Sequence, residues 1–269
     1  MFNVKEYQSR LLEGVKQFLE SNNFQEFMHF SATFHSYSFG NILMIWSQRS
    51  GASRVAGIKT WNSLGRCIRK GEKGIAIFAP MIAERQKEDI LDNDGVINQK
   101  TLTGFSQVYV FDVSQTEGKD LPVFDIGKPV MDGNADALVE RILQISPVPV
   151  ELEDMTEGRN GYYAQEKRIA LSTSLNAAEK AKTLLHELAH HLTHEKNIEG
   201  LDRANKEIIA EGSAYVGAAY FGFDASNYSP AYLANWGQDY LKIFSTCQIM
   251  HDIATDLITM MNNSRFLPL

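Results

Sequence analysis

The feature that most constrains this chain is a pair of histidines separated by three residues. The stretch from Ala181 to His194 reads AKTLLHELAHHLTH, and within it His186, Glu187 and His190 form an H-E-x-x-H pattern. On an α-helix, residues i and i+4 lie on one face, so both imidazoles can bind one metal ion. The pattern therefore predicts a metal-binding helix, with Glu187 placed to act as a general base.

A short pattern of this kind also occurs in helices that bind no metal, so the surrounding residues have to show whether this helix is a metal-binding one. The helix has an apolar side formed by Leu184, Leu185, Leu188 and Leu192. Such a side packs against a core. We therefore expect the two histidines to lie in a cleft.

A third ligand is expected from the next helix, where Glu211 is followed by Gly-Ser-Ala. Glu211 is preferred because its E-G-x-A context resembles the glutamate helix of gluzincin peptidases, and small neighbours suit a crowded site. Glu207, one turn earlier, is the alternative, and would otherwise orient a ligand imidazole. Two imidazoles and one carboxylate are typical of catalytic Zn²⁺ with a position open for water, although they also admit Mn²⁺ or Co²⁺.

Hydrolysis of an amide also needs a group that stabilises the oxyanion. Tyr215, one turn after Glu211, is assigned this catalytic role, with His194 as the other candidate. His191 is expected to point away from the metal. The segment Arg168–Ser172 is expected to be an edge strand, which would bind an extended peptide through its backbone.

Charge is distributed unevenly along the chain. The net charge is −7, yet residues 49–73 contain seven Lys or Arg residues and one acidic residue. A polyanion is therefore expected to bind the N-terminal part. The stretch places basic residues beside aromatic ones, and cations neutralise phosphates while aromatic rings stack on bases. This combination predicts a groove for single-stranded DNA. A solvated Lys/Arg loop beside a core strand fits the composition equally well. The residues assigned to DNA binding are Lys59, Trp61, Arg66, Arg69, Lys70 and Lys73, with Phe78, Tyr109 and Phe111 nearby.

The hydrophobic periodicity predicts an α+β protein with two domains. Residues 1–120 are predicted to combine N-terminal helices with a small antiparallel sheet, residues 121–130 to form a linker, and residues 131–269 to form the metal-binding domain. The first part should contain helices near 4–19, 24–34 and 37–46, a short helix capped by Thr60, a strand at 75–79 ended by Pro80, a hairpin excursion at 85–100 and a strand at 107–113. The second should contain helices near 136–145, 176–196 and 204–221, one or two more helices between 228 and 261, and strands near 148–153, 161–165 and 168–171.

Two further features bear on the compartment. Cys67 and Cys247 lie far apart and outside any C-x-x-C pattern, which is typical of reduced thiols in a cytosolic protein. Charged residues interrupt the first twenty positions, so neither a signal peptide nor a membrane span is expected. The prediction is a cytoplasmic protein without a membrane partner.

Several motifs resemble ArdC-type antirestriction proteins. In the N-terminal part they are FHSYSFGN at 34–41, VAGIKTW at 55–61, RKGEKGIAI at 69–77 and VFDVSQTE at 110–117, and in the C-terminal part HELAH at 186–190 and IAEGSAY at 209–215. One departure is Ile209, where the family often has an acidic residue.

The resemblance implies a single-stranded-DNA-binding domain joined to a zincin-like, Zn²⁺-dependent peptidase domain, carried on mobile elements and protecting incoming DNA from restriction. Its protein substrate is not revealed by the sequence. Two alternatives are a DNA-binding protection protein with a structural or idle metal site, and a cytosolic peptidase without a DNA role.

Overall fold

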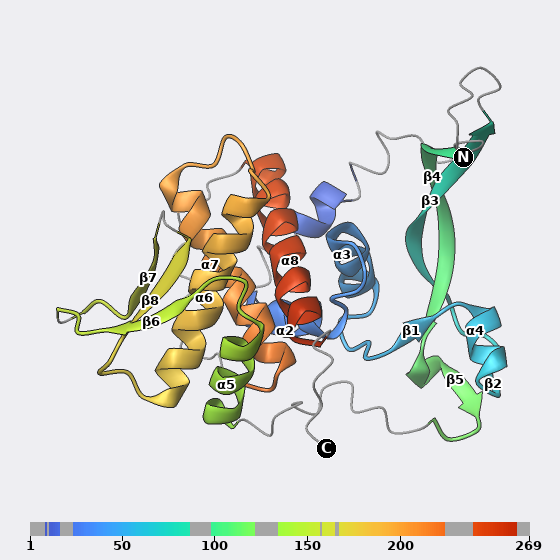
Figure 1. Cartoon of the computed structure of the whole chain (residues 1–269). Helices are drawn as coiled ribbons and strands as arrows, with labels where there is room; N and C mark the ends of the chain where they lie inside the picture. Colours follow the sequence, from blue (N-terminus) through green and yellow to red (C-terminus); the bar gives the residue numbers. More distant parts are fainter. Residues whose placement is uncertain are drawn as a thin grey trace. The chain divides into compact units, whose positions relative to one another are not determined.

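The computed structural model of the chain describes residues 9, 11–16, 24–86, 98–121, 134–156, 158–164, 167–223 and 239–262. The chain packs as two compact units, drawn with their elements in Figure 1. The first consists of Met1–Gln17 and Leu43–Leu121, and the second of Phe18–Ile42 and Pro122–Leu269. Residues 18–42 thus pack with the second unit, although the sequence groups them with the N-terminal domain. The predicted domain boundary at 121–130 stays a prediction.

The first unit is built on a long antiparallel hairpin. Strand β3 (Ile75–Gln86) pairs with β4 (Asn98–Asp112) along its whole length, with a register shift between Met81 and Ile82. The prediction that the strand ends at Pro80 is wrong, because β3 is an edge strand, where a residue without an N–H is tolerated. The middle of the predicted hairpin excursion, residues 87–97, lies outside the described residues.

Short elements complete this unit. β1 (Val55–Ala56) pairs with β4, and β2 (Arg66–Ile68) pairs with β5 (Thr116–Gly118), which follows the short 3₁₀ helix η1 (Val113–Gln115). Helix α4 (Ile58–Ser63) begins after Gly57 without a side-chain cap, so the predicted capping role of Thr60 is wrong. The helix ends at Ser63, and Gly65, two residues later, has a φ of +74° that disfavours other residues.

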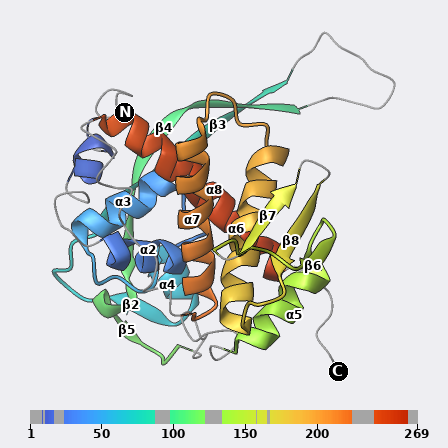
Figure 2. The ribbon, with the colours of Figure 1, turned by 90° about the vertical axis from the view of Figure 1, so that its left-hand side faces the viewer.

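The second unit is a helical layer packed on a small sheet. Its helices are α2 (Phe24–Thr33), α5 (Ala135–Ile145), α6 (Ala177–Glu195), α7 (Arg203–Tyr220) and α8 (Tyr240–Asn262), while α3 (Phe39–Gln48) spans the sequence boundary between the units. Helix α7 packs against α2, α6 and α8, and α6 also packs against α5 (Figure 2). These helices and the predicted α+β class are confirmed. In the predicted first helix, residues 9 and 11–16 are described and helical.

The sheet of the second unit has the order β6-β8-β7, with β6 (Val150–Glu153) parallel and β7 (Gly161–Ala164) antiparallel to β8 (Arg168–Ser172). The prediction that residues 168–172 form an edge strand is therefore wrong. The edge that lies near the metal-binding helix is β7, which packs against α6. A Cβ at Gly161 would come within 2.7 Å of Thr183 Cγ2, so glycine permits this close approach.

Two minor features concern thiols and membranes. Cys67 is exposed and Cys247 is buried, and both are free thiols. Within the part of the chain that the structure describes, none of the helices combines the length and apolar character needed to cross a bilayer.

Candidate metal centre

Local capping fixes where the metal-binding helix begins. Asn176 accepts a hydrogen bond from the Glu179 backbone N–H at 3.0 Å, and the Glu179 carboxylate accepts one from the Asn176 N–H at 2.9 Å. This capping box closes the first turn of α6, which then runs unbroken to Glu195. His186 and His190 consequently lie one turn apart on the same face.

Three side chains converge on one point between α6 and α7. The Nε2 atoms of His186 and His190 are 3.1 Å apart, and Glu207 Oε2 lies 3.5 Å from each of them. Ligand atoms around a tetrahedral ion with bonds of about 2.0–2.1 Å would be ~3.3 Å apart. The two imidazoles and the Glu207 carboxylate therefore fit a divalent metal ion in both chemistry and spacing.

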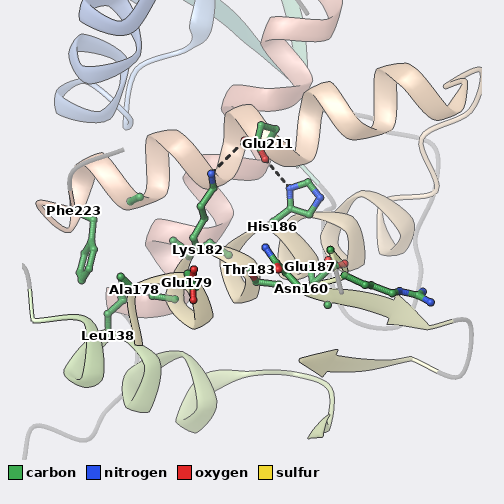
Figure 3. Close-up of a pocket in the computed structure, with 16 residues that line it drawn as sticks. Leu138, Asn160, Ala178, Glu179, Lys182, Thr183, His186, Glu187, Glu211 and Phe223 are labelled. Atoms are coloured by element: carbon green, nitrogen blue, oxygen red, sulfur yellow. Dashed lines mark ion pairs between the residues drawn. The ribbon is translucent and has the colours of Figure 1, made fainter. Parts of the chain in front are cut away.

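Glu211 occupies a different position from the one the sequence predicts. Its Oε2 lies 3.2 Å from His186 Nδ1, and its Oε1 lies 3.8 Å from Lys182 Nζ (Figure 3). Nδ1 is the ring nitrogen opposite the one near His190. In the structure Glu207, rather than Glu211, therefore completes the three-residue group among the described residues.

The buried environment sets the protonation of these groups. Burial lowers the pKa of His186, but the carboxylates of Glu211, Glu187 and Glu207 outweigh it and the net shift is upward. Burial and the charge of His186 lower the pKa of His190. An imidazole held neutral is the form that binds a metal ion.

Glu187 is almost completely buried, with 7% of its surface exposed. Burial is the main cause that raises the pKa of its carboxyl group, against the opposing charge of His186. A carboxylate with a raised pKa is a better proton acceptor near neutral pH. Its place beside the imidazoles suits the predicted general base.

Two cavities meet at the centre, and both are lined by His186 and Glu187. The first, of about 630 Å³, extends past Lys182 and Glu211 and is drawn in Figure 3. The second, of about 840 Å³, extends past His190 and Glu207. Both walls also include Gly161 of the edge strand β7, so the centre is open to a molecule lying along that strand.

The remaining predicted residues of the second unit, Tyr215, His194 and His191, differ in burial and in whether they line a cavity. Tyr215 is 3% exposed, packs its ring 5.7 Å from that of His29, and is not among the described residues that line the two cavities. His194 is exposed and lines the second cavity. His191 Nδ1 lies 3.2 Å from the Tyr163 hydroxyl, and His191 stands outside the metal group as predicted. Burial makes Tyr215 a core residue rather than an oxyanion-stabilising group.

Two residues near the centre were not predicted from the sequence. Lys182 precedes His186 by one turn, and this i, i+4 spacing was the available signal. Arg159 lines both cavities from the turn before β7, and no sequence pattern indicated it.

The predicted DNA-binding residues divide into buried and exposed groups. Trp61 is fully buried and donates a hydrogen bond from Nε1 to the Phe111 carbonyl at 2.9 Å, so its ring faces are not available to a base. Arg66 hydrogen-bonds to Thr116, and Arg69 pairs with Glu72 at 2.7 Å. The exposed members are Lys59, Arg69, Lys70 and Lys73.

One exposed aromatic residue lies beside this basic stretch. Tyr109 on β4 is 56% exposed. A Cβ at Gly74 would come within 2.9 Å of Tyr109 Cβ, so the ring stands next to the segment that carries Lys70 and Lys73. Phe78 and Phe111 are buried, so in this group Tyr109 presents its ring to solvent.

The fold and the centre together define a class of two-unit protein. Its first unit is built on a β-hairpin and carries the basic stretch, and in its second unit an H-E-x-x-H helix faces a glutamate-bearing helix beside a small sheet. Comparison with known families makes this class specific. Residues 7–111 match the N-terminal domain of anti-restriction factor ArdC, and residues 144–245 match the IrrE N-terminal-like domain of the peptidase M78 family. The chain therefore combines an ArdC-type N-terminal domain with an IrrE-like domain of the peptidase M78 family.

Individual relatives agree with this assignment. An uncharacterised protein of Bacillus anthracis is 24% identical over 304 residues, which cover 95% of this chain and 50% of the relative. The chain thus spans about half the length of that curated relative. Two crystal structures of the antirestriction protein ArdC from plasmid R388, one metal-free and one bound to Mn(II), superpose with a TM-score of 0.53. Their sequence identities are 24% and 22%; the alignments cover 86% of this chain, and 87% and 86% of the respective relatives. At this identity they show a shared fold.

Proposed function

We propose that this protein protects incoming DNA of a mobile element against restriction, binding single-stranded DNA with its first unit and hydrolysing peptide bonds at a Zn²⁺ centre in its second. The observation that carries the peptidase proposal is the convergence of His186 Nε2, His190 Nε2 and Glu207 Oε2 within 4.8 Å of one another, beside the buried Glu187.

In this proposal His186, His190 and Glu207 hold the ion. When bound, the ion supplies a Lewis acid for the peptide carbonyl and lowers the pKa of a water molecule. That one solved ArdC relative is bound to Mn(II) supports a divalent ion as the ligand of this group. Glu211 remains the sequence-based alternative as third ligand; on the geometry it orients His186 through Nδ1.

Glu187 accepts the proton of the attacking water and passes it to the leaving amine. Burial raises its pKa, which brings its basicity closer to neutral pH. His194 lines the cavity and replaces Tyr215 as the proposed contact of the oxyanion.

The DNA-binding part of the proposal rests on the first unit. The exposed ammonium groups of Lys59, Lys70 and Lys73 supply the charge that neutralises phosphates, and Tyr109 supplies the stacking face in place of Trp61. Tyr109 packs against Gly74, the residue that follows Lys73 in the chain. The match to the ArdC N-terminal domain supports the same assignment.

The central test is a Glu187→Gln variant of the full chain, with Glu199→Gln, an exposed position remote from the centre, as matched control. We expect the Glu187 variant to keep bound Zn²⁺ and single-strand affinity and to lose proteolysis, because the amide cannot accept the proton. Proteolysis is followed by mass spectrometry on unfolded proteins, and metal content by elemental analysis.

The same variant separates the alternatives. Antirestriction that survives in cells expressing Glu187→Gln identifies a DNA-binding protection protein with an idle or structural metal site. Unchanged proteolysis in that variant would contradict the assignment of Glu187 as the base.

A further inference from the structure

The two cavities that meet at the metal centre have different chemical walls. The first ends away from the histidines in apolar residues, among them Leu138 and Phe223 (Figure 3). The second has the basic residues Arg203 and Lys206 on its wall, and Arg159 lies on the walls of both cavities. A peptide that crosses the centre would therefore meet unlike surroundings on its two sides.

The apolar end of the first cavity is built from core residues. Leu138 of α5 is fully buried and Ala218 of α7 is 5% exposed, so these walls are fixed by packing of the second unit. Phe223 closes the same end, immediately after α7. The volume of about 630 Å³ admits a bulky apolar side chain. Burying such a side chain here removes apolar surface from water.

Among the described residues that line the second cavity, the three Lys or Arg residues outnumber the two glutamates. Within the described ranges, no carboxylate forms an ion pair with Arg159, Arg203 or Lys206. The acidic members of this wall are Glu187 and Glu207, and Glu207 faces the two imidazoles. Opposite charge near such a wall is attracted more strongly than in open solvent. An acidic side chain of a bound peptide suits this cavity.

Strand β7 sets the order in which a peptide meets the two cavities. Asn160 and Gly161, where β7 begins, line the first cavity, and Tyr162 and Tyr163 further along the strand line the second. In the described sheet, β7 pairs with β8 along one edge. A peptide added antiparallel to the other edge runs from the second cavity to the first in its N-to-C direction.

We infer that the site selects an extended peptide segment with an acidic side chain on the N-terminal side of the cleaved bond and a bulky apolar side chain on the C-terminal side. This inference rests on the proposed peptidase function, and it adds the substrate class. Arg203 and Lys206 select the acidic residue, while Leu138 and Phe223 select the apolar one.

Binding is tested separately from cleavage. Zn²⁺-loaded Glu187→Gln protein is titrated with fluorescein-labelled peptides that differ in two positions, Glu or Lys on the N-terminal side and Leu or Ser on the C-terminal side. Fluorescence anisotropy should show the Glu/Leu peptide binding about tenfold more tightly than either singly changed peptide, which corresponds to ~1.4 kcal/mol. Equal affinities for the four peptides, or no measurable binding of any, would overturn the inference.

Variants then assign the preference to the two walls. The double change Arg203→Glu with Lys206→Glu should abolish or reverse the preference for Glu over Lys and keep the preference for Leu. Phe223→Ser should weaken the preference for Leu alone. Lys242→Glu, an exposed charge change outside both cavities, is the matched control and should alter neither. A control effect as large as that of the double variant would show a general charge effect and overturn the inference.

Cleavage by the wild-type protein is measured on the same peptides by mass spectrometry. Cleavage between the acidic and the apolar residue supports the inference, and cleavage with the reversed order contradicts it. If no peptide is cleaved while the binding preference persists, the proposed peptidase activity fails and the selective peptide groove stands.

Discussion

Oε2 of Glu211 lies 3.2 Å from Nδ1 of His186, on the side of the ring opposite the nitrogen that faces His190. This contact lacks hydrogen-bond geometry, so the buried Nδ1 has no hydrogen-bond partner within the described part of the chain. Glu207, one turn earlier on α7, approaches the Nε2 atoms instead. In the proposed arrangement the two glutamates have separable roles, Glu207 as a metal ligand and Glu211 as the carboxylate beside the other nitrogen of the His186 ring.

Zn²⁺ affinity should distinguish these roles. We expect Glu211→Gln to weaken Zn²⁺ binding by about 10–100-fold, the usual effect of losing a group that orients a ligand, and Glu207→Gln to weaken it further. Competition with a chromophoric chelator measures both affinities, and Glu199→Gln serves as the matched control. A larger loss in Glu211→Gln than in Glu207→Gln would make the sequence-based choice of Glu211 correct and the geometric choice wrong.

The metal-binding helix could be predicted closely because its signals are local. A capping box at Asn176, an apolar stripe and the i, i+4 spacing of the histidines all lie within one element. The choice between Glu207 and Glu211 was harder, because one helical turn separates them and their distance from the imidazoles depends on how α7 packs against α6.

Burial and strand order were the parts that sequence could not supply. Trp61 lies in a basic stretch, yet its indole is fully buried and donates a hydrogen bond to the Phe111 carbonyl of β4. That partner is fifty residues away in the sequence, so the local sequence does not reveal the burial. Residues 168–172 were correctly predicted as a strand, but their central position follows from pairing with β6 and β7 together. Long-range packing decides both features, and local periodicity carries no information about it.

Packing between α7 and α8 should make Gly212 intolerant of a side chain. A Cβ at Gly212 would overlap Sδ of Met250, which is 2% exposed, so Gly212→Ala forces a rearrangement of the buried core. We expect a loss of about 1–3 kcal/mol in the free energy of unfolding, measured by urea denaturation.

Gly217 on the same helix is the matched control. A Cβ there would meet Leu185 Cδ2 at 3.9 Å and Leu257 Cδ1 at 4.0 Å, which are ordinary contacts. Gly217→Ala should leave stability unchanged or raise it by about 0.5–1 kcal/mol, because alanine favours the helix. Equal destabilisation by both substitutions would contradict the role of Gly212.

Single-strand affinity should depend on Tyr109 and not directly on Trp61. Tyr109→Ala should weaken single-strand binding by about 1–3 kcal/mol without unfolding, because the ring is exposed. Trp61→Phe should instead cost about 1–3 kcal/mol of folding stability, because the Phe111 carbonyl loses its partner. Fluorescence anisotropy at two salt concentrations measures binding, and thermal unfolding monitors the fold. Loss of affinity in a folded Trp61→Phe protein, with Tyr109→Ala unchanged, would reverse this assignment.

Lysine substitutions on the same surface should reduce the salt dependence of binding. For each phosphate that an ammonium group no longer neutralises, the slope of log K against log salt should become shallower by about 0.7. Lys70→Ala and Lys73→Ala are the test variants, and Lys242→Ala, on α8 of the other unit, is the matched control. Unchanged slopes in both test variants would support the cytosolic peptidase without a DNA role.

His251 should make the stability of the second unit depend on pH. The ring is 2% exposed, with Nε2 2.8 Å from the Tyr37 carbonyl and Nδ1 3.3 Å from the Ser31 hydroxyl. Burial, together with the charge of His35, lowers the pKa of His251 in the folded protein. The unfolded chain, with an ordinary histidine pKa of about 6.5, therefore binds more protons. This stabilising contribution is complete above pH ~6.5 and is lost as the pH falls from there through the folded pKa.

A glutamine at position 251 should remove this part of the pH dependence. We expect His251→Gln to be less stable than wild type at pH 7.5 by about 1–3 kcal/mol, because it cannot satisfy both buried partners equally well. The difference between the two proteins should shrink as the pH falls toward 5, since only the wild type must protonate a buried ring. Urea denaturation at a series of pH values measures this difference, and the remaining histidines, shared by both proteins, cancel in the comparison. A difference that stays constant from pH 7.5 to pH 5 would show that His251 does not couple protonation to folding.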